Sequence, residues 1–464
     1  MKKVLFISLV IVLALGVSLA GCTGPTPPSG PEEILVGLAR DSDGGPLGVF
    51  ECGYGGTVYR WFANKVNDAG GVHLSDYDTE TEDWMAPVEL LVRDFDVLTW
   101  DLADVTLGLI DDGVDFVWGG PGTDCIFTQA PICNAAAKVL ITLEGGASSM
   151  IWDEDIDSWP YVWVSLSFSN WNQIPVLHDM LEDEVGPDPT AYMTYIGDQG
   201  STHGIEYRDE TLTEFGAENV IDAGFHSYWL FDHPGEADAI IADAKAAYNA
   251  TPYDIFCAYT YPWNVAALTL ALMASDFDPP AIIFGPGGNS NSYGTVDFGP
   301  YANGVCSFIV ADNHTSTEIT DMYAELAVQA EADWDDAALK CDQGAYTSGW
   351  DTLDYWGQPC YAAALEMWKA AVEAAGNLNS ADVRDALAGF SSENPADTVL
   401  GDCWFEVFGP VVGGVGQGGG ILSYECHPAE IGQWQSFEYR SVGGIAPTAS
   451  FIYPNTGNWF WLLD

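Results

Sequence analysis

The chain has 464 residues, enough for two domains or one large one. Hydrophobic residues make up 48% of it, which excludes a disordered chain, whereas 13 basic and 68 acidic residues give a formal net charge of −55. Such a charge excludes binding to nucleic acid through its phosphates and attraction to an anionic lipid surface. Two explanations of the acidity stay open: a saline or cation-rich exterior, or drift at surface positions where acidic residues are tolerated.

The N-terminus has the pattern of an export signal. Two lysines precede an apolar run, Val4–Leu19, which is typical of a secretory signal peptide rather than a spanning helix. The tetrapeptide Leu19-Ala20-Gly21-Cys22 resembles the bacterial lipobox, which implies that residues 1–21 are removed and that Cys22 is lipidated. Residues 22–33 then form a Pro/Gly-rich tether, and no later run is apolar enough to span a bilayer. We therefore expect an extracytoplasmic protein anchored to the cell membrane by its lipid.

The cysteines that follow Cys22 are candidates for disulfides in an oxidising compartment, with at least one left over. The favoured pairs are Cys403 with Cys426 and Cys341 with Cys360, although sequence alone does not determine connectivity. No CxxC pair or Cys/His metal spacing occurs, so we expect no metal. No GxSxG, HExxH or phosphate-loop lysine occurs either, so we expect neither an enzyme nor a cofactor.

Strands and helices alternate along most of the chain, which predicts parallel sheets covered on both faces. The first run is expected to comprise strands Ile34–Ala39, Val88–Arg93, Val114–Trp118 and Val139–Leu143, and helices Thr57–Asp68 and Cys125–Ala137. The alternation breaks at Asp153–Trp159 and restarts, which predicts two similar α/β lobes. The second run is expected to comprise strands Tyr161–Ser167, Tyr192–Ile196, Val220–Ala223, Tyr253–Tyr259, Ala281–Phe284 and Gly304–Ala311, and helices Gly204–Phe215, Glu236–Tyr248, Val265–Ala274, Glu318–Ala332, Tyr361–Ala375 and Ser380–Leu387. The tail from Leu400 has β-like alternation.

Two turns rich in small residues follow neighbouring strands in the first run. The first is Gly119-Gly120-Pro121-Gly122, after which Thr123 and Asp124 can cap a helix, and the second is Glu144–Ser149. Open α/β sheets bind ligands at the carboxyl ends of their strands, and small residues let backbone amides approach a bound anion. The turns therefore indicate the floor of a pocket, although every βαβ unit has turns at these places.

Six short motifs lie between residues 34 and 401. They are Ile34–Gly37, Val66–Val72, Pro87–Val92 with Asp94, Leu109–Asp115, Val383–Gly389 and Asp397–Gly401. By these motifs and their order, the chain resembles the branched-chain amino acid (leucine/isoleucine/valine) type of extracytoplasmic solute-binding protein that serves ABC importers. The resemblance implies the type I periplasmic binding protein fold: two Rossmann-like lobes with parallel sheets, joined by three hinge crossings and closing over a solute.

The same resemblance implies the division of the chain. Lobe 1 is expected to contain residues 34–158 plus 312–398, and lobe 2 residues 159–311 plus 399–464. The three crossings are expected near Trp159, Val310 and Leu400.

The resemblance also implies where a solute binds. The candidate pocket residues are Thr123, Ala147, Ser148 and Ser149 in the first lobe and His203, Tyr259, Tyr261 and Gly287 in the second. His203 stands where the family often has an aromatic residue. Gly287 stands where amino-acid binders of this family usually have an acid that holds the α-ammonium group. This departure leaves room for an amide, a urea-like solute, a short organic acid or a bulkier ligand.

The leading functional hypothesis is a lipid-anchored receptor that captures a small polar solute and delivers it to the membrane subunits of an ABC importer. The solute classes it covers are a branched-chain amino acid, an amide, a urea-like compound or a short organic acid. Its expected partners are the solute, those subunits and the membrane through its lipid; we expect a monomer that binds no nucleic acid. A ligand-sensing lipoprotein of the same fold, coupled to a signalling partner, is the alternative. A surface lipoprotein that has lost ligand binding is a third possibility.

Overall fold

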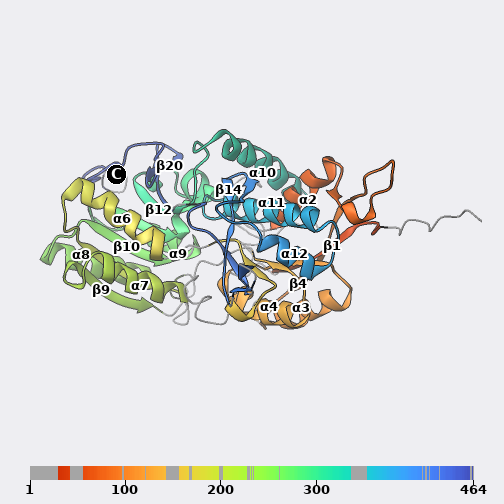
Figure 1. The fold of residues 1–464 in the computed structure, drawn as a ribbon. Coiled ribbons are helices and arrows are strands. Elements are labelled where there is room, and N and C mark those ends of the chain that lie inside the picture. Colours follow the sequence, from red (N-terminus) through yellow and green to blue (C-terminus); the bar gives the residue numbers. More distant parts are fainter. Residues whose placement is uncertain are drawn as a thin grey trace, which may run out of the picture.

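Two α/β lobes lie side by side in the computed structural model of the chain (Figure 1). The structure describes residues 30–41, 56–96, 99–120, 122–142, 156–166, 170–197, 202–226, 230, 233, 235–260, 262–335, 353–409, 411–412, 415–416, 418–427, 429–459 and 462. The lipidation candidate Cys22 and the pocket candidates Ala147, Ser148, Ser149 and Tyr261 lie outside these residues. In the described part, no helix combines the length and apolar character that crossing a membrane requires.

The first lobe is built on a seven-stranded sheet with strand order β15-β18-β7-β6-β5-β1-β4. Neighbours from β4 to β18 are parallel and only β15 is antiparallel. The strands are β1 (Ile34–Asp41), β4 (Val88–Phe95), β5 (Phe116–Trp118), β6 (Leu140–Ile141), β7 (Val162–Val164), β15 (Phe405–Val407) and β18 (Gly420–Leu422). The helices are α2 (Gly56–Asp68), α3 (Leu102–Asp111), α4 (Thr123–Ala135), α10 (Thr317–Asp335), α11 (Gln358–Ala375) and α12 (Ser380–Leu387).

Aromatic packing holds helices on the first sheet. The apolar positions of α2 recur at helical spacing, so one face of the helix is buried against the sheet. On that face Phe62 packs at the edge of Trp118 at the end of β5, with ring centroids 6.0 Å apart. Trp118 also meets Trp368 of α11 edge to face at 5.2 Å and 87°. Helices α3 and α4 cover the other face, so the strands are buried on both sides as a parallel sheet requires.

The second lobe has a seven-stranded sheet with strand order β20-β19-β12-β11-β10-β8-β9. The strands are β8 (Ala191–Ile196), β9 (Val220–His226), β10 (Ile255–Thr260), β11 (Ile282–Pro286), β12 (Val305–Ile309), β19 (Glu430–Gln435) and β20 (Glu438–Gly443). Its helices are α6 (Asn170–Val185), α7 (Thr202–Glu214), α8 (Glu236–Ala250) and α9 (Pro262–Met273), with α6 packed on α7 and α8 on α9. The β-like tail thus supplies the antiparallel strands β19 and β20.

Short two-stranded pieces complete the described part. They are β2 (Val72–His73) with β3 (Met85–Ala86), β13 (Ala396–Thr398) with β14 (Gly401–Cys403), and β16 (Val411–Val412) with β17 (Val415–Gly416). The 3-10 turn η2 (Ser75–Tyr77) lies between β2 and β3.

Sheet membership corrects two of the three expected crossings. Strand β7 pairs with β6, and β18 pairs with β7, so both belong to the first sheet although we expected them in lobe 2. The first and third crossings therefore follow Val164 and Leu422 rather than Trp159 and Leu400. The second crossing follows Ile309, close to its expected place at Val310, because the next helix, α10, packs on α2 of the first lobe.

Helix α6 was not predicted, although its sequence carries a signal. Ile174, Leu177 and Leu181 are fully buried and recur at helical spacing. Pro175 lies inside the helix and reads as a helix breaker in sequence. It is the sixth residue of the helix, so one backbone hydrogen bond is lost there, and the burial of the apolar face offsets that loss.

The expected disulfides are not formed in this structure. All seven cysteines in the described part are free and buried. The thiols of Cys403 and Cys426 contact each other through a hydrogen bond instead of a covalent bond. Cys426 Sγ also accepts the Trp404 N–H at 3.3 Å. Cys360 is a free thiol too, and its expected partner, Cys341, lies outside the described residues.

Asp312 connects the second crossing to strand β20. Its side chain is fully buried and accepts the N–H groups of Ser441 at 2.7 Å and His314 at 2.6 Å. The hydroxyl of Thr448 donates to the same carboxylate, and Arg440 lies 3.7 Å away. Charge-assisted hydrogen bonds of this kind are the strong ones in a protein interior, so this carboxylate fixes the start of the crossing.

Glu430, at the start of β19, generates a pH-dependent prediction. Burial raises its pKa from 4.5 to about 7, and the nearby Asp312 adds to the shift. Between these values the folded state holds a proton that the unfolded chain has released, so stability falls as the pH rises through this window. We expect Glu430→Gln to remove this loss, and the variant to be more stable than the wild type above pH 7 by on the order of 2 kcal/mol.

Urea unfolding of both proteins at several pH values measures this difference. Glu425→Gln changes an exposed glutamate nearby and serves as the control. A constant difference between Glu430→Gln and the wild type across the pH range would contradict the assignment.

Tyr259 of β10 belongs to a stack of aromatic rings inside the second lobe. Its ring lies 4.8 Å from Tyr207 at an interplanar angle of 7° and 5.4 Å from Tyr195. Tyr207 in turn stacks on Phe308 of β12 at 5.3 Å. The Tyr259 hydroxyl is 3.0 Å from the Thr211 hydroxyl, and only 3% of the residue is exposed. The ring therefore ties α7 to the sheet.

We expect Tyr259→Ala to lower the free energy of unfolding by about 3–5 kcal/mol, because it leaves a cavity in this stack. Tyr259→Phe keeps the ring and loses one hydrogen bond, so its cost is about 1 kcal/mol. Urea unfolding measures both, with Tyr424→Ala at an exposed position as the control. If Tyr259→Ala left stability unchanged, the ring would not act as a packing element.

Candidate functional site

All three crossings join the carboxyl edges of the two sheets. The chain leaves β7 at Val164 and enters α6 at Asn170, and it leaves β12 at Ile309 and enters α10 at Thr317. Strand β18 runs parallel to β7 and is followed by β19, whose Glu430 pairs with Ile309 at the end of β12. Connections this short require the two edges to face each other. The strand ends of both lobes therefore converge on one region, the position at which open α/β sheets bind ligands.

In the first lobe, small and hydroxyl residues occupy these strand ends. Gly119 follows β5, and its carbonyl accepts the hydroxyl of Tyr59 at 2.9 Å. The N–H of Gly120 donates to the Gln129 side chain at 2.8 Å. These bonds hold the turn against α2 and α4, so its backbone is fixed in place. A Cβ at Gly119 would lie 3.3 Å from three neighbouring atoms, so a larger residue would have to displace them and glycine does not.

Thr142 and Ser165 carry hydroxyl groups at two further strand ends of this lobe. Thr142 follows β6, and its hydroxyl oxygen accepts the Ser165 N–H at 3.2 Å. The Ser165 hydroxyl is buried at the end of β7 and has no hydrogen-bond partner among the described residues. It is thus a buried polar group with unused hydrogen-bonding capacity at the edge facing the other lobe.

Thr123 lies in the first turn of α4 instead of capping the helix. Gly122 occupies the N-cap position with φ of 86°, a conformation that glycine adopts without strain. The expected caps, Thr123 and Asp124, are the first two helical residues. Thr123 is 7% exposed, and the N-terminus of α4 is at the carboxyl edge of the sheet. The positive end of the helix dipole of α4 favours a carboxylate or carbonyl oxygen there.

In the second lobe, Thr260 and Asn264 organise the end of β10. The Thr260 hydroxyl donates to the Ile196 carbonyl at the end of β8 at 2.8 Å. The Asn264 side chain donates to the Thr260 oxygen at 2.9 Å and accepts the Leu230 N–H at 2.9 Å. This network joins two strand ends and the start of α9, and it keeps the edge rigid.

The turn after β11 brings two asparagines to the boundary between the lobes. Gly287 begins this turn and is buried, as are Asn289 and Asn291. Asn289 donates to the Phe308 carbonyl at 2.9 Å. The Asn291 N–H donates to the carbonyl of Leu353, just before α11 of the first lobe, at 3.0 Å. Asn289 Oδ1 and Asn291 Nδ2 are buried with no hydrogen-bond partner in the described part of the chain.

Only some of the predicted pocket residues stand at the facing strand ends in the part that the structure describes. Thr123 and Gly287 both stand at facing strand ends. Tyr259 is the penultimate residue of β10, and its ring lies in the aromatic stack of the lobe. His203 lies in the first turn of α7, and its side chain is not among those described. The structure describes none of Ala147, Ser148, Ser149 or Tyr261, whose pocket roles stay predictions.

Sequence reasoning missed several polar residues at this edge. They are Thr142, Ser165, Thr260, Asn264, Asn289 and Asn291. Thr260, Asn289 and Asn291 follow a predicted strand directly or stand in the turn after it, a signal that could have found them. Thr142 and Ser165 were placed inside the predicted strands Val139–Leu143 and Tyr161–Ser167, whereas β6 ends at Ile141 and β7 at Val164. All six are neutral, so they can recognise a solute by hydrogen bonding and offer no carboxylate to an ammonium group.

No model of a protein family and no curated protein matches the sequence. Solved structures do match the fold. One is the branched-chain amino acid transporter substrate-binding protein LivJ of Streptococcus pneumoniae in complex with isoleucine, with a TM-score of 0.61 and 13% identity over 89% of this chain and 100% of that one. A solute-binding protein of an ABC transporter from Rhodopseudomonas palustris in complex with 3,4-dihydroxybenzoic acid has a TM-score of 0.64 and 13% identity over 92% and 99%.

A second solute-binding protein from R. palustris, in complex with benzoate, has a TM-score of 0.62 and 14% identity over 90% of this chain and 98% of that one. At these identities the likeness establishes the fold. The chain thus has the type I periplasmic binding protein fold, with two lobes built on parallel sheets, which confirms the fold class predicted from its sequence.

Proposed function

We propose that this protein is a solute-binding receptor that captures a small polar solute between its two lobes. The observation that carries the proposal is the convergence of neutral hydrogen-bonding residues from both sheets on one region. Thr123 and Ser165 come from the first lobe, and Asn289 and Asn291 from the second. The likeness to receptors solved with isoleucine and with benzoate supports it.

The chemistry of the strand ends narrows the class of solute. With Gly287 at the start of the turn after β11, that position lacks the carboxylate that a plain amino acid would use for its ammonium group. The N-terminus of α4 and the neutral amides favour carboxylate, carbonyl or amide groups. The proposed solute is therefore an amide, a urea-like compound or a short organic acid.

We also propose that the receptor is a lipoprotein that delivers its solute to an ABC importer. Support comes from the lipobox-like tetrapeptide ending in Cys22 and from the transporter origin of the similar structures. Because two or more acyl chains anchor a protein stably where one does not, the lipid would hold the receptor at the membrane.

The solute is tested by thermal-shift screening of the protein against amino acids, amides, urea, short organic acids and benzoates. We expect at least one amide or acid to raise the melting temperature, since a ligand that binds only the folded state stabilises it. For that solute, Ser148→Ala and Tyr261→Ala should each weaken binding about fivefold to tenfold in calorimetry, the effect of one lost hydrogen bond.

Two exposed positions supply matched controls, Ser391→Ala and Tyr424→Ala, which should bind as the wild type does. A panel in which no solute shifts the melting temperature would argue for a protein that has lost ligand binding. Wild-type affinity in both pocket variants would remove Ser148 and Tyr261 from the site.

The anchor is tested separately by expressing the full chain in a bacterium that processes lipoproteins. The wild type should incorporate labelled fatty acid and partition with membranes, whereas Cys22→Ser should do neither. Labelling of the Cys22→Ser variant would place the lipid elsewhere, and an unlabelled wild type would contradict the lipoprotein assignment.

A further inference from the structure

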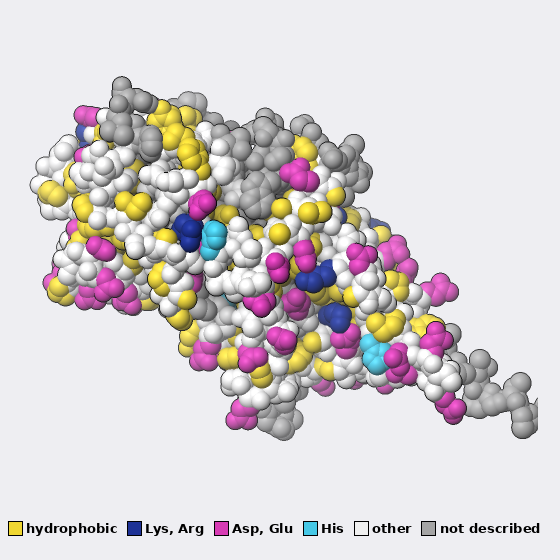
Figure 2. Space-filling model, turned by 90° about the horizontal axis from the view of Figure 1, so that it is seen from above, with side chains coloured by type: hydrophobic (Ala, Val, Ile, Leu, Met, Phe, Trp, Pro, Cys, Tyr) yellow, Lys and Arg dark blue, Asp and Glu magenta, His cyan; other side chains and the backbone are white. Residues whose placement is uncertain are grey.

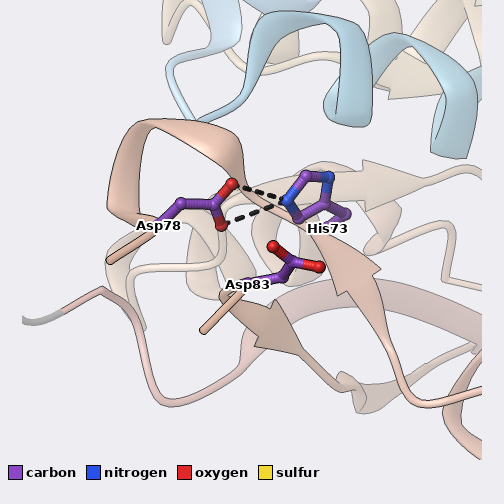
Figure 3. A group of neighbouring side chains, drawn as sticks. All are labelled: His73, Asp78 and Asp83. Carbon is purple, nitrogen blue, oxygen red and sulfur yellow. Dashed lines mark hydrogen bonds and ion pairs between the residues drawn. The ribbon is translucent and has the colours of Figure 1, made fainter. Parts of the chain in front are cut away.

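A histidine and two aspartates converge in the β2–β3 excursion of the first lobe. His73 lies on β2, Asp78 follows η2, and Asp83 precedes β3. The two Asp78 oxygens are 2.9 and 3.1 Å from His73 Nε2. Figure 3 shows both carboxylates pointing toward the imidazole, and one atom of each side chain lies within 4.8 Å of the other two.

Contacts behind this cluster hold its members in place. The Trp84 N–H donates to Asp78 Oδ1 at 2.7 Å, and the Trp84 indole donates to the Pro31 carbonyl at 3.1 Å. The backbone of His73 donates to Glu373 of α11 at 3.4 Å. Such supporting bonds orient ligands at metal sites.

We propose that His73, Asp78 and Asp83 bind a divalent transition-metal ion, for which Zn²⁺ is the best match, with water completing the coordination. One imidazole nitrogen and two carboxylates suit zinc and its neighbours, whereas calcium and magnesium prefer oxygen ligands alone. Two ligand atoms about 2.1 Å from a tetrahedral ion lie about 3.4 Å from each other. The spacing of His73 and Asp78 is already close to this value, and Asp83 stands in an exposed segment that can close the remaining gap.

The proximity of the three side chains depends on the path of this loop, because each stands five residues from the next: on β2, after η2 and before β3. A second group of possible ligands consists of His178, Asp179 and Glu182 and differs from the first. Its members follow each other on the single helix α6, so proximity there is a consequence of adjacency. The ring of His178 also packs edge to face on Phe215, with ring centroids 5.1 Å apart.

A bound ion would have a structural consequence that can be measured. Strands β2 and β3 are short, with the ladder pairs Val72 with Ala86 and His73 with Met85, and the Leu74 N–H donates to the Trp84 carbonyl at 2.9 Å beyond them. Residues 79–83 between them are exposed. Metal bonds from β2 to Asp78 and Asp83 would close this loop and protect it, in particular at Glu80 and Glu82, which a glutamate-specific protease recognises.

The test is titration of the chelator-treated full chain with Co²⁺ and Zn²⁺, in high salt with excess Mg²⁺ to occupy the acidic surface. We expect one Co²⁺ per chain with the visible absorption of a tetrahedral site, displaced by Zn²⁺. His73→Gln and Asp83→Asn should each weaken binding at least about tenfold. The matched control, His178→Gln, should bind as the wild type does.

Proteolysis supplies the second readout. Zn²⁺ should slow cleavage after Glu80 and Glu82 in the wild type and in His178→Gln, but not in His73→Gln; fragments are identified by mass. Circular dichroism establishes that the variants fold, and Asp83→Asn changes an exposed side chain. Equal Zn²⁺ affinity in His73→Gln and the wild type, or the absence of saturable binding in the wild type, would overturn the proposal. Neither readout depends on the solute between the lobes.

Discussion

The short crossings between the sheets are the constraint on which the rest of this structure depends. Each begins or ends at the carboxyl edge of a parallel sheet, and the chain between β12 and α10 is fixed by the buried carboxylate of Asp312. Because the crossings are short, the edges face each other and their strand-end residues share one region. Open α/β sheets bind ligands at the carboxyl ends of their strands. This fold brings two such edges together.

The fold class could be predicted from sequence because its signals are local. A few residues suffice to predict elements such as the buried strand Ile34–Ala39 and the amphipathic helix α2. Which sheet a strand joins is not local. Strands β7, β15 and β18 have three residues each, and the pairing that places β18 and β15 in the first sheet joins Gly420 to Trp163, far away in the chain. The crossings were therefore misplaced at Trp159 and Leu400.

The candidate site was predictable to a similar extent. The turn before Thr123 and the turn that contains Gly287 stand out because small residues follow apolar strands. The position of Asn291 at the boundary between the lobes depends on its contact with Leu353, which no spacing in the sequence encodes. The cluster around His73 is hidden for the same reason, since its five-residue spacing fits neither a helix nor a strand.

The scarcity of basic residues shapes the surface of the molecule. Acidic side chains are spread over the face in Figure 2, where few basic ones appear. The described basic residues bond to protein oxygens: Arg60 to Asp333 at 2.9 Å, which joins α2 to α10, and Lys138 to the Val114 carbonyl at 2.6 Å. With its cations engaged in this way, the surface presents uncompensated carboxylates that attract metal ions from solution. A site that adds an imidazole to two carboxylates selects transition metals from that pool.

The facing edges are chemically different from this surface, and the difference bears on how a solute could couple to closure. Asn289 Oδ1 and Asn291 Nδ2 are buried without a hydrogen-bond partner among the described residues, which costs about 1–3 kcal/mol for each atom. The same turn is joined to the first lobe by the bridge between Ser290 and Asp354. Under the proposed function, a solute that bonded to these amides while the bridge is formed would recover that cost. A ligand shifts the populations of open and closed arrangements only by such a difference in its affinity for them.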